Sequence, residues 1–119
     1  MKRRMVWWMI GGLGLTAVAA GCFFLGNLSP IASFTATPNH GTSPLSVDFD
    51  ATASSDPDGT IAEYFWDFGD GQTDSKTLPT VTHIYVNVQS DSKVFTGILT
   101  VSDDLGAEDT AVKNITVDP

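Results

Sequence analysis

Cysteine is almost absent from this chain of 119 residues, which contains only Cys22. One thiol cannot close a disulfide within the chain, so any folded domain must be stabilised by packing and hydrogen bonds. Cys22 also lies inside an apolar N-terminal run rather than in the remainder of the chain. The remainder has about 90 residues, and domains of about 60 residues already fold without cross-links.

Basic residues are also scarce, and arginine does not occur after position 4. Beyond the first four residues, three lysines stand against all 14 acidic residues, a formal net charge of −11. Nucleic-acid binding draws its affinity from lysines and arginines that neutralise phosphates. The charge therefore argues against nucleic acid as a partner and leaves cationic partners, divalent cations and neutral sugars open.

Residues for catalysis are few as well, because the chain has only two histidines, His40 and His83. Neither stands in a Ser–His–Asp, Cys–His or His-Glu-x-x-His arrangement. His40 lies in a turn between Asn39 and Gly41, where we expect it to be exposed to solvent. The sequence predicts a protein that is not an enzyme.

The N-terminus has the features of a membrane-targeting segment. Lys2, Arg3 and Arg4 precede 21 residues without a charge, Met5 to Leu25. A basic start, an apolar stretch and small residues are typical of a secretory signal. The tetrapeptide Ala19 to Cys22 resembles the lipobox of bacterial lipoproteins, although that family prefers Leu where Ala19 stands. This resemblance implies a signal peptide over residues 1–22 and lipidation of Cys22.

An uncleaved transmembrane anchor over residues 5–25 is the main alternative. Twenty-one helical residues span about 31 Å, enough to cross a hydrocarbon core. Trp7 and Trp8 suit a membrane interface, and the apolar run continues past Cys22. In both interpretations residues 23–30 include a linker, and the domain is extracytoplasmic and membrane-anchored with its N-terminus inside. Secretion with a free thiol is less favoured.

The chain after Pro30 shows the alternation typical of β-strands. Leu45, Val47 and Phe49 alternate with polar residues, and Leu99 and Val101 are expected to point inward in a later strand. The expected strand regions are 31–36, 45–50, 60–68, 81–88, 95–102 and 107–117. No segment shows the 3.6-residue period of a helix. Six or seven short strands separated by turns predict an all-β sandwich behind an N-terminal apolar helix.

The segment Trp66-Asp67-Phe68-Gly69-Asp70-Gly71 resembles the most recognisable hexapeptide of the PKD family. Four other segments agree with that family in the right order, and the resemblance covers about residues 31–118. They are 44–50, 55–59, 83–85 and 99–106. The resemblance implies an immunoglobulin-like antiparallel β-sandwich of about seven strands that is not catalytic.

The hexapeptide is interpreted as structural. Trp66 and Phe68 are two residues apart and share a face, together with Tyr64, whereas Asp67 points to the other face. Gly69 and Gly71 allow positive φ in a tight corner, where Asp70 can accept bonds from nearby backbone N–H groups. The resemblance implies that His83 and Tyr85 are also structural, with the Tyr85 hydroxyl tying a corner of the sandwich.

One strand departs from the family's usual pattern. Phe95 stands where the family has Tyr, and Gly97 occupies an inward position. An inward glycine leaves a gap the size of a side chain, or it marks a bulge. The register of this strand is therefore the structural feature that the sequence determines least.

Calcium is the one cofactor for which candidate residues exist. Asp56 and Asp58 lie in one turn, and Asp103 lies in another. Calcium prefers carboxylate and carbonyl oxygens on flexible loops. These three residues resemble the calcium-binding positions of some collagenase PKD-like domains, with no ligand identified nearer the N-terminus. The favoured alternative is that both turns are ordinary and bind no metal.

A contact surface is predicted at Tyr64 or Phe65, the aromatic residues of the tryptophan strand that are candidates for exposure. Sandwich faces that bind sugars or proteins commonly present such residues. The first hypothesis is a module that binds a surface protein or polysaccharide, tethered to the membrane through its N-terminus. The second is a structural spacer without a specific ligand.

Overall fold

The computed structural model describes residues 26–119 of the chain. Cys22 and the apolar helix expected over residues 5–25 lie outside the described residues. Among residues 26–119, no helix is long and apolar enough to cross a membrane.

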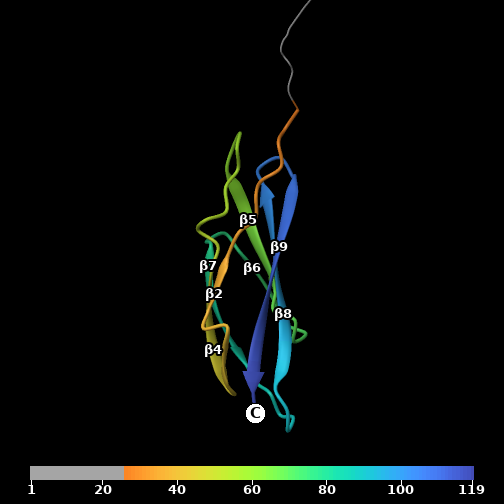
Figure 1. Cartoon of the computed structure of the whole chain (residues 1–119). Coiled ribbons are helices and arrows are strands. Elements are labelled where there is room, and N and C mark those ends of the chain that lie inside the picture. Colours follow the sequence, from red (N-terminus) through yellow and green to blue (C-terminus); the bar gives the residue numbers. More distant parts are fainter. Residues whose placement is uncertain (1–25) are drawn as a thin grey trace, which may run out of the picture.

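The described residues form eight strands in two sheets, which confirms the all-β sandwich (Figure 1). A three-stranded sheet has the order β2-β4-β7, and a five-stranded sheet has the order β3-β9-β8-β5-β6. The strands are β2 (Thr35–Thr37), β3 (His40–Thr42), β4 (Leu45–Asp50), β5 (Ile61–Asp67), β6 (Thr73–Lys76), β7 (Thr80–Tyr85), β8 (Lys93–Asp103) and β9 (Glu108–Asp118).

The first expected strand, 31–36, is shorter in the structure, where Ile31 makes only an isolated bridge to Ser55 and β2 begins at Thr35. The chain then changes sheets at Pro38 and forms the additional strand β3. Strand β2 pairs with β4 in one sheet, and β3 then pairs with β9 in the other. Proline lacks the N–H that a continuous ladder needs, so the strand breaks there. The β3–β9 pair is parallel, so the prediction of a wholly antiparallel sandwich was wrong in this one pair.

Strand β6 was missing from the expected strand regions, and with β3 it raises the number from about seven to eight. Its sequence, Thr73 to Lys76, contains no apolar residue and so gives no alternation. It forms because the turn after Phe68 returns the chain antiparallel to β5. Backbone pairing at the sheet edge, rather than burial, holds this strand.

The core is an aromatic cluster between the two sheets, centred on Trp66, which is 1% exposed. The Trp66 ring meets Phe34 edge-on at 5.3 Å and Phe49 at 5.4 Å. Leu99 and Val101 are fully buried beside it, as the alternation predicted. Removing such a side chain to Ala costs about 3–5 kcal/mol, so this cluster dominates the packing between the sheets.

Gly97 marks neither a gap nor a bulge. Its strand, β8, pairs with β9 in continuous register from Lys93 to Ser102. A Cβ built on Gly97 would lie 3.3 Å from Ile115 Cδ1 and 3.5 Å from Phe49 Cε1. Side chains of the neighbouring strand and the opposite sheet therefore already occupy the space that a larger residue would need.

The two longest strands, β8 and β9, set the two ends of the sandwich. Each has 11 residues and so spans about 33 Å. Asp103 ends β8 at one end, together with the turn that leads into β9 (Figure 1). Lys93 begins β8 at the other end, opposite Val117 of β9. We call these the Asp103 end and the Lys93 end.

Candidate functional site

Three carboxylates predicted as calcium ligands lie together at the Asp103 end. Ligand oxygens of Asp56, Asp58 and Asp103 all lie within 4.8 Å of one another. Asp56 and Asp58 come from the turn before β5, and Asp103 is the last residue of β8. The pairing of Ile61 with Asp103 brings the turn and the strand end together.

Asp103 is a buried carboxylate with several hydrogen-bond donors around it. Its Oδ2 accepts a bond of 2.6 Å from Asn27 Nδ2, and its Oδ1 accepts bonds from the backbone N–H groups of Leu105 and Ala107. The Asn27 bond, and then the backbone bonds, lower the pKa of Asp103. This carboxylate is therefore held in its ionised form.

Asp56 differs from Asp103 both in its hydrogen-bond partners and in the direction of its pKa shift. Its Oδ2 is buried and has no hydrogen-bond partner among the residues that the structure describes. Burial raises the pKa of Asp56, and the interaction with the Asp58 side chain and the charges of Asp58 and Asp103 act in the same direction. The bond from the backbone N–H of Asp58 to Asp56 Oδ1 opposes them without reversing the shift of the pKa. A buried acceptor without a partner is costly, and more so when it carries charge. The cluster is thus electrostatically strained without a counter-charge.

The segment before the domain also reaches this cluster, which the sequence did not reveal. Besides the Asn27 bond, the backbone N–H of Leu28 donates to Asp58 Oδ2 at 2.9 Å. Asn27 and Asp103 are 76 positions apart, so no local pattern signalled the contact. Turning the Asn27 amide would present its Oδ1 to the cluster in place of Nδ2.

Gly59 completes the turn that carries two of these carboxylates. A Cβ at this position would lie 3.0 Å from Asp56 Oδ2 and 3.1 Å from Asp104 Oδ1. A larger side chain would therefore press on the cluster. Three carboxylates, one unpartnered oxygen and a neighbouring amide match the oxygen-rich ligands that calcium prefers. The residues present fit a calcium ion.

The hexapeptide forms the corner between β5 and β6. Gly69 and Gly71 have φ of 82° and 91°, in the left-handed region that favours glycine. At Gly69 a Cβ would also lie 2.3 Å from the carbonyl oxygen of Thr96. Asp67 and Asp70 each accept a backbone bond within the turn, from Gly69 N and Gln72 N.

His83 and Tyr85 bind this corner to the three-stranded sheet. His83 Nε2 lies 2.7 Å from Asp70 Oδ2, and its ring stacks on Phe68 at 3.9 Å with an interplanar angle of 2°. The Tyr85 hydroxyl donates to the Phe68 carbonyl at 2.8 Å, and burial raises the Tyr85 pKa. The other histidine, His40, is largely exposed and pairs with Asp118. No catalytic arrangement forms among the described residues.

Of the two predicted contact residues, only Phe65 lies on the outer face of the five-stranded sheet, with 40% of its area exposed. Tyr64 is half-buried and packs against the core, so of the two alternatives Phe65 is the one exposed on this face. The cause is the alternation of β5, which places Tyr64 on the same inner side as Trp66.

The neighbours of Phe65 follow from the register. Phe65 pairs with Thr100 of β8 and Ser75 of β6. Two residues before Thr100 in β8, and on the same face of the sheet, Ile98 pairs with Val112 of β9. Val112 is 57% exposed. Aromatic and aliphatic groups thus share this outer face with hydroxyls. We call it the Phe65 face.

The fold and the corner around Trp66 define an immunoglobulin-like β-sandwich module. The sequence profile of the PKD domain matches residues 27–117. The chain therefore belongs to the PKD domain family, which confirms the resemblance of its hexapeptide.

Sequence relatives include a metalloprotease and a collagenase. The chain is 38% identical over 92 residues to the pre-pro-metalloprotease PrtV of Vibrio cholerae, covering 77% of this chain and 9% of that protein. It is 35% identical over 80 residues to the collagenase ColQ1 of Bacillus cereus, covering 67% of this chain and 8% of that protein. The chain thus spans about a tenth of the length of these curated relatives.

Solved structures agree with the family. The PKD1 domain of the Vibrio cholerae metalloprotease PrtV matches with a TM-score of 0.61 and 37% identity, over 77% of this chain and all of that one. A structure described in terms of the promiscuous specificity of carbohydrate-binding modules of the β-sandwich superfamily matches with a TM-score of 0.72 and 38% identity. It covers 79% of this chain and 36% of that chain.

The raised pKa of Asp56 predicts how the stability of the metal-free protein depends on pH. A carboxyl whose pKa is raised on folding stabilises the domain below its ordinary value of 3.8, and this contribution is lost as pH rises through the folded-state pKa. Asp56→Asn is therefore expected to increase the free energy of unfolding at neutral pH in buffer with chelator. Urea unfolding measures the change, which should vanish below pH 3.8.

Asp103→Asn is the matched variant, and it is expected to change the free energy of unfolding in the opposite direction. Its carboxyl has a lowered pKa, so its contribution is present above 3.8 and is lost as pH falls through the folded-state pKa. The variant should therefore be less stable than the unchanged protein at neutral pH. If both substitutions destabilise equally in chelator, the strain assigned to Asp56 is wrong.

Proposed function

We propose that this chain is a non-catalytic, membrane-tethered extracytoplasmic module that contacts a surface protein or polysaccharide through its Phe65 face. The observation that carries the proposal is the exposed Phe65 ring, which shares its sheet face with the exposed Val112 and with hydroxyls. A single exposed apolar residue is ordinary, whereas exposed apolar groups that share one face favour a contact surface.

The composition of the Phe65 face supports a carbohydrate or protein ligand. Aromatic and aliphatic groups bury the apolar side of a ligand, and hydroxyls supply hydrogen bonds at its rim. Hydroxyls lie on each strand around Phe65, namely Thr73 and Ser75 on β6, Thr96 and Thr100 on β8, and Thr110 and Thr116 on β9. The similarity to a structure described for carbohydrate-binding modules supports the same proposal.

A spacer is the second candidate function, and the path of the chain favours it. Asn27 is bound at the Asp103 end, whereas β9 finishes with Asp118 at the Lys93 end. Any segments joined before residue 27 and after residue 118 would thus be held apart by the length of the sandwich (Figure 1). This geometry suits separation without a ligand.

A calcium ion at the Asp103 end would serve either function. Asp56, Asp58 and Asp103 would hold it, with the Asn27 amide turned toward it. The ion would supply the counter-charge that Asp56 lacks and would fix the segment around Asn27 and Leu28 against the domain. For a tethered module, this would set how the sandwich is oriented relative to its tether.

Calcium is expected to stabilise the protein by mass action. Extracellular calcium modules have Kd values of about 10⁻⁴–10⁻³ M, so roughly 10 mM calcium should add about 1.4–2.7 kcal/mol to the free energy of unfolding. Isothermal titration and thermal unfolding with CaCl₂ measure this, and Asp56→Asn should lose the effect. No heat and no thermal shift at millimolar calcium would rule out the site.

The membrane tether is tested by the intact mass of the protein extracted from membranes. Processing as a lipoprotein is expected to add the mass of acyl chains through a thioether at Cys22 and to remove residues 1–21 by cleavage before that cysteine. A full-length mass indicates the anchor over residues 5–25 instead. Recovery of the protein only from the medium would contradict both forms of the tether.

The Phe65 face is tested by sedimentation of the full chain with insoluble chitin, cellulose and collagen. Phe65→Ser is expected to weaken binding about tenfold, since one central aromatic commonly carries that much energy. Ile84→Ser is the matched control, because Ile84 is 56% exposed on the other sheet. Equal binding by both variants, or no binding to any polymer, would leave the spacer as the function.

A further inference from the structure

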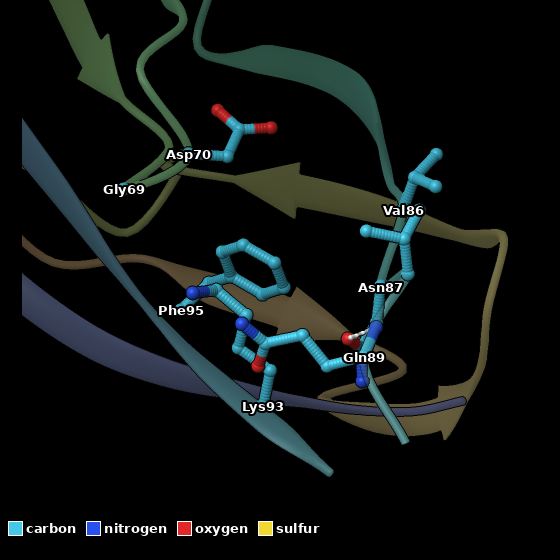
Figure 2. A pocket seen from close by; sticks show the side chains of 8 residues that line it. Gly69, Asp70, Val86, Asn87, Gln89, Lys93 and Phe95 are labelled. Atoms are coloured by element: carbon cyan, nitrogen blue, oxygen red, sulfur yellow. Dashed lines mark hydrogen bonds between the residues drawn. The ribbon is translucent and has the colours of Figure 1, made fainter. Parts of the chain in front are cut away.

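A cavity of about 340 Å³ lies at the Lys93 end, away from the acidic cluster and outside the proposed calcium site (Figure 2). Its wall on one side is the Gly69–Asp70 corner, and on the other side it is the loop from Val86 to Gln89. Phe95 and Lys93, at the start of β8, complete it. This volume is at the lower end of the range for small-ligand sites, enough for one or two residues of a peptide.

Both walls of the cavity are held rigidly. Asn87, which is 6% exposed, donates from its backbone N to Ser43 Oγ and from Nδ2 to the carbonyls of Asp91 and Val117, each at 2.8 Å. Its Oδ1 accepts a bond from Gln89 N. On the opposite wall, Asp70 is fixed by His83. A site formed in advance loses little entropy when it binds a ligand.

The cavity contains one cation and one carboxylate. Lys93 Nζ lies 5.4 Å from the centroid of the Phe95 ring, and no carboxylate within residues 26–119 lies close enough to pair with it. The Asp70 carboxylate across the cavity already accepts a bond from Gln72 N at Oδ1 and lies 2.7 Å from His83 Nε2 at Oδ2. Lys93 is therefore the charged group of the lining that has no polar partner among these residues.

The remaining lining is mixed, and its aliphatic members are two valines. Val86 and Val88 are 59% and 91% exposed at the rim, where they would lose contact with water on binding an apolar group. The Phe95 ring is only 4% exposed, so it offers no open face on which a sugar ring could stack. Because most polar side chains here already have partners, the several hydroxyls of a sugar would be left unsatisfied.

We propose that this cavity binds the C-terminal residue of a peptide with an aliphatic side chain. The carboxylate pairs with Lys93, and the aliphatic side chain packs between Val86, Val88 and the edge of Phe95. Such a residue carries its anion and its branched apolar group on the same Cα, which matches one cation beside two valines. The site is separate from the Phe65 face and does not depend on it.

The test uses the full ¹⁵N-labelled chain, kept in solution with a mild non-ionic detergent because of its apolar residues 5–25. The probe is acetyl-Gly-Gly-Val with a free C-terminal carboxylate, titrated while amide resonances are recorded. Saturable shifts are expected at Val86, Val88, Gln89 and Lys93. The same peptide with a C-terminal amide should cause no such shifts, because it lacks the charge that pairs with Lys93.

Variants separate this site from the rest of the molecule. Lys93→Gln should weaken binding of the carboxylate peptide about tenfold or more. Lys76→Gln removes a surface lysine paired with Asp74 and should leave binding unchanged. Phe65→Ser should also leave it unchanged, so failure of the Phe65 face and failure of this site are distinguishable.

Three results would overturn the assignment. Equal shifts with the amidated peptide would show that the terminal carboxylate is not recognised. Unchanged binding by Lys93→Gln would show that Lys93 does not pair with the peptide. Stronger shifts with glucuronate than with the peptide would show that the cavity takes an acidic sugar instead.

Discussion

The packing of Trp66 between the two sheets is the constraint on which the rest of this protein depends. With no disulfide available to the domain, the two sheets are held by the contacts of this ring with Phe34 and Phe49. The indole N–H is buried without a hydrogen-bond partner among residues 26–119. Packing must therefore offset the loss of its bond to water, which makes the close fit of this cluster essential.

The corner after Trp66 connects the aromatic core to the surface of the domain. Phe68 continues the core, stacks on His83 and accepts the Tyr85 hydroxyl through its carbonyl. The same corner places Asp70 at the wall of the cavity at the Lys93 end. One short segment thus joins the core, the link between the two sheets and a rigid concave surface, which explains why so compact a motif identifies the family.

At the Asp103 end, electrostatic interactions between carboxylates dominate rather than apolar packing. There, Asp103 is stabilised as an anion by its donors, whereas Asp56 is destabilised by burial and by its acidic neighbours. A purely structural turn would gain from a neutral residue at position 56. The N–H groups of Asn27 and Leu28 donate to Asp103 and Asp58 at this end, whereas Asp56 Oδ2 has no partner among the described residues.

The sequence by itself determined the strands that alternate, the burial of Trp66, Leu99 and Val101, the glycine corner and the family, because each of these follows from local periodicity or a short motif. It did not reveal the crossing of the chain between sheets at Pro38, since that is set by the pairing of β3 with the distant β9. It also missed strand β6, since the polar residues of that strand give no alternation. It also left Tyr64 and Phe65 undecided as contacts. Only the tertiary structure brought Asn27 to Asp103 and Lys93 to the Val86–Gln89 loop, because contacts between residues far apart in the chain leave no periodic trace in it.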